Sequence, residues 1–281
     1  MIRFFLILTM FFVFTEGFSQ RNPKLSTNGR GTLFGDFNYN RSYYGTSTLD
    51  FNGNGYVFSL ANVLFSDNPD DQGGYLNSSG IEYFQFTGNV GYFISPKWAI
   101  SVGFARYNLF MNHDQTYDLE GTFAPNIHND LEGSYDGGAI NLNGEQLNYE
   151  QIDGVNYLSI AFHRSDLLYK HRKAYLEILS DISIGGGVLF SNADYTFNYS
   201  TRQQNTSLSG MGFHTSLGIK TIFSQLFYLR LGFRTGALNN GNVELGQQSS
   251  LSHTVGFISP EIGVGFSYFF KTDDCNTCPQ W

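Results

Sequence analysis

One histidine and one serine stand close enough in the sequence to suggest nucleophilic chemistry. His163-Arg164-Ser165 places an imidazole two residues from a hydroxyl, and Glu177 follows further along the chain. A carboxylate that orients an imidazole, which in turn activates a serine, is the arrangement of a nucleophilic hydrolase. A His-x-Ser tripeptide is common by chance, so the elements that carry it decide whether it means anything.

Cys275 and Cys278 form a CxxC pair in a short polar tail, residues 271–281. A redox-active pair needs a helix N-terminus to lower the pKa of a thiol. A structural zinc site needs two further ligands. In an oxidising compartment we therefore expect a local disulfide between Cys275 and Cys278.

Acidic residues gather in two segments, 45–81 and 112–153, which together hold thirteen acids and no Lys or Arg. Diffuse counterions around solvated loops are one interpretation. The other is bound Ca²⁺, which prefers carboxylate and carbonyl oxygens. The best local cluster is Asp67, Asp70 and Asp71, without EF-hand spacing. We expect no other cofactor, and the net charge of −8 argues against nucleic-acid binding, which needs a basic surface.

The first nineteen residues indicate export. Arg3 precedes an apolar run from Phe4 to Phe14, which is too short to span a bilayer as a helix. Small residues then lead to a cleavage site after Ser19, the plan of a secretory signal peptide. The boundaries predicted are a signal peptide at 1–19, a periplasmic lead at 20–31, a barrel at 32–270 and a periplasmic tail at 271–281.

Eight runs alternate apolar residues with polar or small ones at a period of two, the pattern of transmembrane β-strands. Only 14% of residues are charged and 17% are aromatic, which suits a surface in lipid. The sequence therefore predicts an all-β fold, a closed antiparallel transmembrane barrel of eight strands. The runs are 32–44, 82–94, 98–105, 158–163, 174–190, 211–220, 227–234 and 258–270.

The connections alternate between long and short. Outer-membrane barrels have long extracellular loops and short periplasmic turns, so both termini are expected in the periplasm. The two acidic segments contain β-like pieces of their own, which either extend the barrel above the membrane or raise the strand number to ten or twelve. A secreted soluble β-sandwich or barrel is the alternative. It does not explain the alternation of loop lengths.

A signal peptide, alternating strands and a last strand ending in aromatic residues (Gly263 to Phe270) resemble the small outer-membrane barrels, the group that includes OmpX, OmpW and the barrel portion of OmpA. The resemblance implies integration into the outer membrane with the help of the barrel-assembly machinery. The residues Lys271 to Trp281 depart from it, because the signal normally ends the chain. The cleavage site before Gln20 and the Tyr- and Asn-rich loops resemble proteins of the Bacteroidetes.

Charged residues on the polar faces of the runs are expected to meet inside the barrel. Eight strands leave a lumen just wide enough for side chains to fill, and buried charges must be paired. We expect a salt-bridge plug, with Arg234 and Glu261 as one pair; its members are Asp36, Glu177, Asp181, Lys220, Arg230, Arg234 and Glu261. Outside, Arg41 and Arg106 lie just beyond the apolar stretches, where they either snorkel or bind lipopolysaccharide phosphates.

These features favour a non-enzymatic outer-membrane protein in envelope structure, surface interaction or a membrane complex, with lipid and lipopolysaccharide as neighbours and no identified protein partner. An OmpW-like transporter of small apolar molecules is one alternative, which a dry lumen with a lateral opening would support. A barrel enzyme similar to lipid A deacylases is the other, with His163, Ser165 and Glu177. The descending fourth run places these residues at the periplasmic end, away from the outer leaflet.

Overall fold

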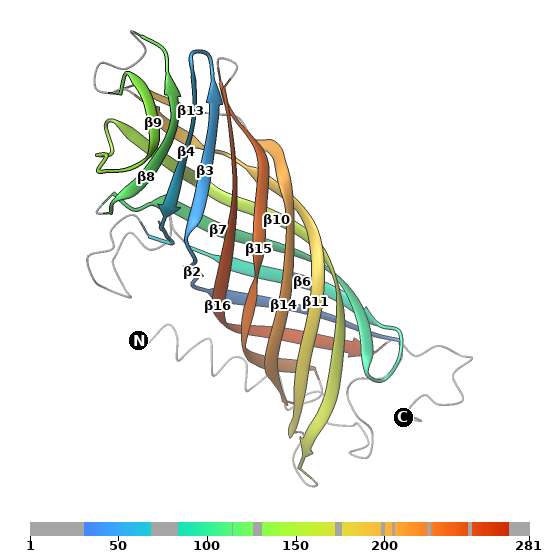
Figure 1. Cartoon of the computed structure of the whole chain (residues 1–281). Coiled ribbons are helices and arrows are strands. Elements are labelled where there is room, and N and C mark those ends of the chain that lie inside the picture. The colour runs from blue at the N-terminus through green and yellow to red at the C-terminus, as the bar shows by residue number, and fades with distance from the viewer. Residues whose placement is uncertain are drawn as a thin grey trace, which may run out of the picture.

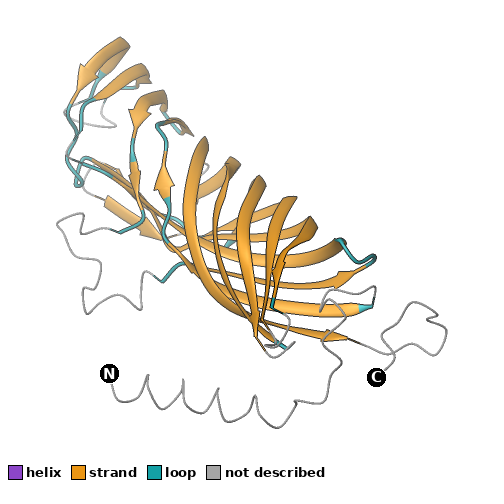
Figure 2. Ribbon diagram, turned by 90° about the horizontal axis from the view of Figure 1, so that it is seen from below, coloured by secondary structure: helices purple, strands orange, loops and turns teal. Residues whose placement is uncertain are grey.

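The described part of the chain is built from strands alone. The computed structural model describes residues 31–68, 84–113, 115–125, 131–171, 176–197, 200–203, 206–223, 226–246 and 249–269 (Figures 1 and 2). Within these ranges no helix is long and apolar enough to cross a membrane. The expected signal peptide, most of the lead and the tail with Cys275 and Cys278 lie outside the described residues.

Eight strands close into a ring of antiparallel neighbours, each next to the one that follows it in this order. Closure comes from the first and last strands, which pair from Thr32↔Phe269 to Asn40↔Glu261. The predicted fold class is confirmed, and each predicted run lies within or overlaps one ring strand. The strands are β1 (Thr32–Asn40), β6 (Phe86–Phe93), β7 (Trp98–Met111), β10 (Leu147–Lys170), β11 (Leu176–Ser191), β14 (Ser207–Phe223), β15 (Phe227–Gly246) and β16 (Ser249–Phe269).

The ring strands differ greatly in length. β10 has 24 residues and β16 has 21, whereas β1 has 9. At about 3.3 Å per residue, β10 is roughly 80 Å long, although about ten residues suffice to cross a bilayer. The long strands are therefore expected to project well beyond the membrane at one end, and Figure 1 shows them running on toward the end that carries β8 (Tyr117–Phe123) and β9 (Gly133–Ile140). The stretch 238–252 lies between the last two predicted runs, where the sequence predicts a long connecting loop; it is mostly strand, in β15 and β16, so that expectation is wrong.

Eight further strands form what we call the extension, which lies at the projecting end. β3 pairs with the upper part of β16, β4 pairs with β3, and β8 and β9 follow in order (Figure 1). The acidic segments thus extend the wall and leave the ring at eight strands. The strands of the extension are β2 (Tyr43–Tyr44), β3 (Ser47–Gly53), β4 (Tyr56–Val63), β5 (Phe65–Ser66), β8 (Tyr117–Phe123), β9 (Gly133–Ile140), β12 (Asp194–Phe197) and β13 (Ser200–Gln203).

The apolar side of the long strands changes from outside to inside along their length. In the lower part of β16, Ile258 and Ile262 are about half exposed on the outer face while Glu261 is buried inside. In its upper part, Leu251 and Val255 are buried inside and Thr254 is exposed. The outer face is therefore apolar along the lower half, as lipid requires, and polar along the upper half, as water requires.

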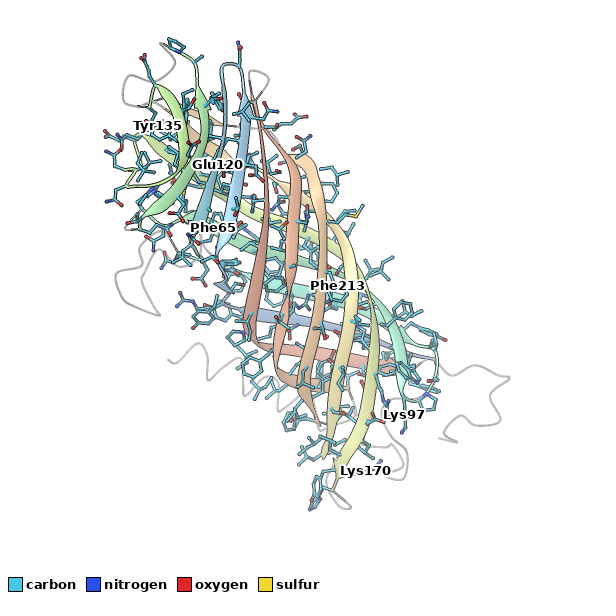
Figure 3. All side chains as sticks on the ribbon, in the orientation of Figure 1. Phe65, Lys97, Glu120, Tyr135, Lys170 and Phe213 are labelled. Atoms are coloured by element: carbon cyan, nitrogen blue, oxygen red, sulfur yellow. The ribbon has the colours of Figure 1, made fainter. Side chains whose placement is uncertain are left out.

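The opposite end of the barrel has short connections. β6 turns into β7 through residues 94–97, where the backbone N–H groups of Ile94 and Ser95 donate to the carbonyl of Trp98 at 3.0 and 3.2 Å. Lys97 and Lys170 mark this end in Figure 3, while Glu120 and Tyr135 mark the extension. The connections at this end are short and the two longest lie at the other end, as the alternation predicts, but β15 and β16 are also joined at that other end by only two residues, 247 and 248.

Candidate functional site

The interior at membrane level is a layer of polar side chains to which every ring strand contributes. All of these side chains are nearly excluded from solvent. The inward positions alternate with lipid-facing apolar residues, so the period of two that defines the strands also supplies the layer. One contributor from each strand in ring order is Asp36, Asn89, Ser101, His163, Asp181, Lys220, Arg230 and Glu261.

Asp181 is one centre of this layer and is 1% exposed. Lys220 Nζ lies 3.0 Å from its Oδ1, and Arg230 Nε donates to its Oδ2 at 3.1 Å. Lys220 comes from the neighbouring strand β14, whereas Arg230 comes from β15, one strand further around the ring. The contacts therefore link three strands at one depth.

Glu261 is the second centre and is 3% exposed. Arg230 Nη1 donates to its Oε2, and Arg234 Nε forms an ion pair with its Oε1 at 2.8 Å. Thr87 Oγ1 adds a hydrogen bond at 3.2 Å. Arg230 thus bridges the two carboxylates, and five of the seven expected network residues form one connected cluster.

The other two expected members have different surroundings. Asp36 accepts hydrogen bonds from the neutral donors Asn38, Asn89 and Tyr228, at 2.8, 2.7 and 3.1 Å. Glu177 lies outside the cluster and pairs with Lys170 at 2.7 Å, near the end with short turns. Sequence periodicity placed both inside the barrel, but it carried no information on depth or partner.

Charge within the layer is balanced. The carboxylates Asp36, Asp181 and Glu261 match three cations, Lys220, Arg230 and Arg234, on the described inward surface. Removing one partner of such a buried set costs about 3–5 kcal/mol, because the other charge is stranded. The arrangement fills the lumen with fixed, mutually neutralised groups.

The side chains of His163, Ser165 and Glu177, the alternative hydrolase site, do not come together. His163 Nε2 lies 2.7 Å from Ser101 Oγ on the neighbouring strand β7, and Ser165 Oγ donates to Asp181 at 3.3 Å. Glu177 is opposite Lys170 in the β10–β11 register, seven positions from His163. Ser101 was missed because nothing in its sequence surroundings marks it; only the pairing of β7 with β10 brings it to the histidine.

Above the ionic layer, the interior is filled by apolar and aromatic side chains. Tyr107, Leu109, Tyr149 and Leu189 are all 0% exposed, and Leu251 is 1% exposed. They belong to one continuous cluster contributed by ring strands and extension strands together. Interiors packed in this way leave few voids larger than a water molecule. The barrel interior therefore contains two successive layers, an ionic layer and a largely apolar layer.

Arg41, expected at the lipid-facing rim, is held by Asp67. Its guanidinium contacts both carboxylate oxygens, at 2.9 and 3.1 Å, and the backbone N–H of Ser42 donates to the same carboxylate at 3.2 Å. Asp67 is thus engaged by an arginine. Asp70 and Asp71 lie outside the described residues, so the calcium hypothesis stays a prediction. Arg106 is half-buried on the outer side of β7, two residues above Phe104.

Acids of the extension have neutral hydrogen-bond partners. Asp50 accepts from Ser59 at 2.6 Å, and Asp118 accepts from Asn62 at 2.5 Å. Glu120 is exposed on β8 (Figure 3). No group of three or more metal-ligating side chains occurs in the part of the chain that the structure describes. The extension therefore presents an acidic surface.

No protein-family description and no curated protein matches this sequence. Several solved structures are similar. OprG of Pseudomonas aeruginosa is 10% identical over 86% of this chain and 98% of its own, with a TM-score of 0.39. The outer membrane protein AlkL is 14% identical over 90% of this chain and 98% of its own, with a TM-score of 0.39. Ail of Yersinia pestis is 10% identical over 85% of this chain and 99% of its own, with a TM-score of 0.32.

These likenesses are too distant to carry an argument about function. The fold follows from the strand pairing itself, together with the apolar outer belt and the polar interior. OprG and AlkL are both described as outer membrane proteins. The chain has the architecture of the small outer-membrane β-barrels, an eight-stranded ring that contains an ionic layer and a largely apolar layer.

Proposed function

We propose that this protein is a non-enzymatic outer-membrane barrel, closed to solutes, that holds its extension at the cell surface for structural or binding contacts. The observation that carries the proposal is the interior with its ionic layer and its largely apolar layer. The groups that could do chemistry are inside it: Ser101 is 2% exposed, His163 is 5% and Asp181 is 1%. A substrate cannot reach an imidazole and a hydroxyl in that position without displacing the plug.

The proposed orientation places the extension outside the cell and both termini in the periplasm. The support is the segregation of long strands and acidic segments to one end and of short turns to the other. This is the usual polarity of outer-membrane barrels. A protease added to intact cells should then cut only within the extension and its connections.

Transport of small apolar molecules is the second candidate, and the apolar upper interior is the observation that favours it. An apolar solute would be compatible with Tyr107, Leu109 and Leu189. Below them, however, the path meets Arg230, Arg234 and Glu261, which are buried and mutually paired. A continuous pathway would have to break these contacts or leave the barrel sideways.

Conductance and uptake decide between the two candidates. The purified full chain should show no channel activity in planar bilayers, and vesicles containing it should take up an apolar dye no faster than empty vesicles. Glu120→Ala, a substitution at an exposed position of the extension, is the matched control, prepared and measured in the same way. Stable ohmic conductance, or dye uptake that saturates with protein, would contradict the proposal; dye uptake alone would favour the transporter.

A further inference from the structure

A polar groove of about 640 Å³ lies in the wall of the extension, where β3, β4, β15 and β16 meet. Pockets that hold small ligands have volumes of this order. Its polar lining includes Thr48, Asp50, Asn62, Asn239, Ser252 and Thr254. Nothing described so far uses this groove.

Three irregularities in strand pairing create the groove. The β3–β4 register shifts beside Thr48, where Asn62 has a φ of 63°, a left-handed conformation that few residues other than glycine adopt. The β15–β16 register shifts after Asn240. Between β2 and β3 the ladder along β16 is interrupted, and Ser47 Oγ instead donates to the carbonyl of Thr254 at 2.9 Å. Bulges of this kind are concentrated at barrel rims and functional sites.

The groove opens on the outer face of the wall. Thr254 and Ile258 lie on the same side of β16, since they are four residues apart, and Asn239 lies on the same side of β15 as Phe233. Ile258 and Phe233 are the lipid-facing residues nearest the extension on their strands, 50% and 59% exposed. Four residues of tilted strand place Thr254 roughly 10 Å above this apolar belt. That height corresponds to the sugars of the outer leaflet, just above its acyl chains.

The lining chemistry selects the class of ligand. Neither lysine nor arginine lines the groove, and Asp50 is acidic, which disfavours an anion such as a lipid phosphate. Asp50 is also its only carboxylate, whereas Ca²⁺ takes six to eight oxygen ligands. Hydroxyls and carboxamides dominate, and they both donate and accept hydrogen bonds. A neutral, polyhydroxylated ligand, a saccharide, has the same double capacity in each of its hydroxyls.

The polar groups at the edge of the groove are available to such a ligand. The side chains of Thr48, Asn239 and Thr254 make no hydrogen bond with any other described residue, and all three are exposed. Many other polar side chains of the extension do have partners, for example Ser59 with Asp50 and Asn62 with Asp118. These three can therefore bind a ligand without breaking contacts within the barrel.

His253 lies behind the groove, with its ring on the inner side of β16 against Phe65 and Tyr149. His253 is 4% exposed, and its Nε2 accepts from Asn240 Nδ2 at 3.1 Å. Because an amide nitrogen only donates, Nδ1 carries the proton of the neutral ring. Nδ1 has no hydrogen-bond partner among the described residues.

We propose that this groove binds a neutral saccharide, and that the saccharide is part of the outer-leaflet glycolipid next to the barrel. The proposal deepens the surface-binding role above and rests on it only in placing the extension outside the cell. A closed barrel without saccharide binding would leave the proposed function standing. A conducting barrel that binds saccharide would overturn only the closed interior.

The test uses the full chain, refolded in synthetic-lipid nanodiscs free of lipopolysaccharide. The probe is the core oligosaccharide released from the lipopolysaccharide of the host strain, dephosphorylated and with the carboxyl group of its terminal sugar acid reduced, so that it is neutral. We expect saturable binding by calorimetry, weakened at least tenfold in the double variant Thr48→Val, Thr254→Val. Valine preserves shape and strand propensity, so the fold should survive, and a heat-modifiable gel band verifies it.

Thr122→Val is the matched control, an exposed threonine on β8 that does not line the groove. It should bind like the wild-type protein. No binding by the wild-type protein, or equal affinity in the double variant, would overturn the proposal. Maltohexaose distinguishes the source of the sugar: if it binds as tightly as the core oligosaccharide, the groove is not specific for the neighbouring glycolipid and that part of the proposal is wrong.

Discussion

Breaking the contact between Arg234 and Glu261 should cost more stability than any exposed substitution in this protein. Glu261→Ala leaves Arg230 with Asp181 at 3.1 Å, but it removes the only ion-pair partner of Arg234 among the described residues. Arg234 is 3% exposed. A stranded charge in such a position costs about 3–5 kcal/mol. We expect a loss of this size in the free energy of unfolding.

The double variant separates pairing from simple loss of packing. Arg234→Ala in the Glu261→Ala background removes the stranded charge, so the combined loss should fall about 2 kcal/mol short of the sum of the single losses, roughly a thirtyfold change in the unfolding equilibrium. Urea unfolding in lipid vesicles, followed by strand circular dichroism and gel mobility, measures all four proteins. Glu120→Ala, exposed on β8, should change stability by no more than about 0.5 kcal/mol. Additive losses within that margin would refute the pairing.

Three other outcomes are expected. Without boiling in detergent the closed ring should stay folded and migrate differently from the boiled protein on a gel, and identical mobility would exclude a barrel. Burial lowers the pKa of His253 from 6.5 to about 4. The extension should therefore be fully stable above pH 6.5 and lose up to about 3 kcal/mol as the pH falls toward 4; hydrogen exchange should show this, and His253→Gln should abolish it. Arg41→Gln should release the contact with Asp67 and quicken proteolysis near residue 67 on intact cells; if it also lowers co-purified lipopolysaccharide, the rim contact predicted from the sequence holds.

The ring was predictable because lipid imposes a simple rule on each strand. Every strand in the membrane must present apolar side chains outward, and the period of two then fixes which residues face inward. Asp181, Lys220, Arg230 and Glu261 were placed inside on that basis. Their distances were not predictable, because depth depends on the shear of the barrel, which a single strand does not record.

The contacts between side chains on different strands could also not be predicted from the sequence. Ser101 meets His163 because β7 and β10 pair with Ser101 opposite Ala161, two positions from the histidine. Arg41 meets Asp67, which is 26 positions further along the chain, because the chain runs out through β2 and β3 and returns through β4. Each contact depends on a register or a return path that local residue types do not encode.

In β7, β10, β15 and β16 the predicted run covers only part of the strand and leaves out its upper part, for a physical reason. Where a strand leaves lipid for water, its outer face must become polar and its inner face can become apolar, so the alternation continues with its phase reversed. The change falls at matching positions in paired strands: Phe104 is opposite Leu158, both exposed and apolar, and two residues further on Arg106 is opposite Asn156. A search for runs in which the same alternating positions stay apolar therefore stops at the membrane boundary, although the strand continues. Allowing the phase to reverse would have recovered the upper strands and their apolar interior from the sequence alone. The same boundary explains why the proposed saccharide groove is polar, since it is built on strand faces that have just passed from lipid into the aqueous sugar layer.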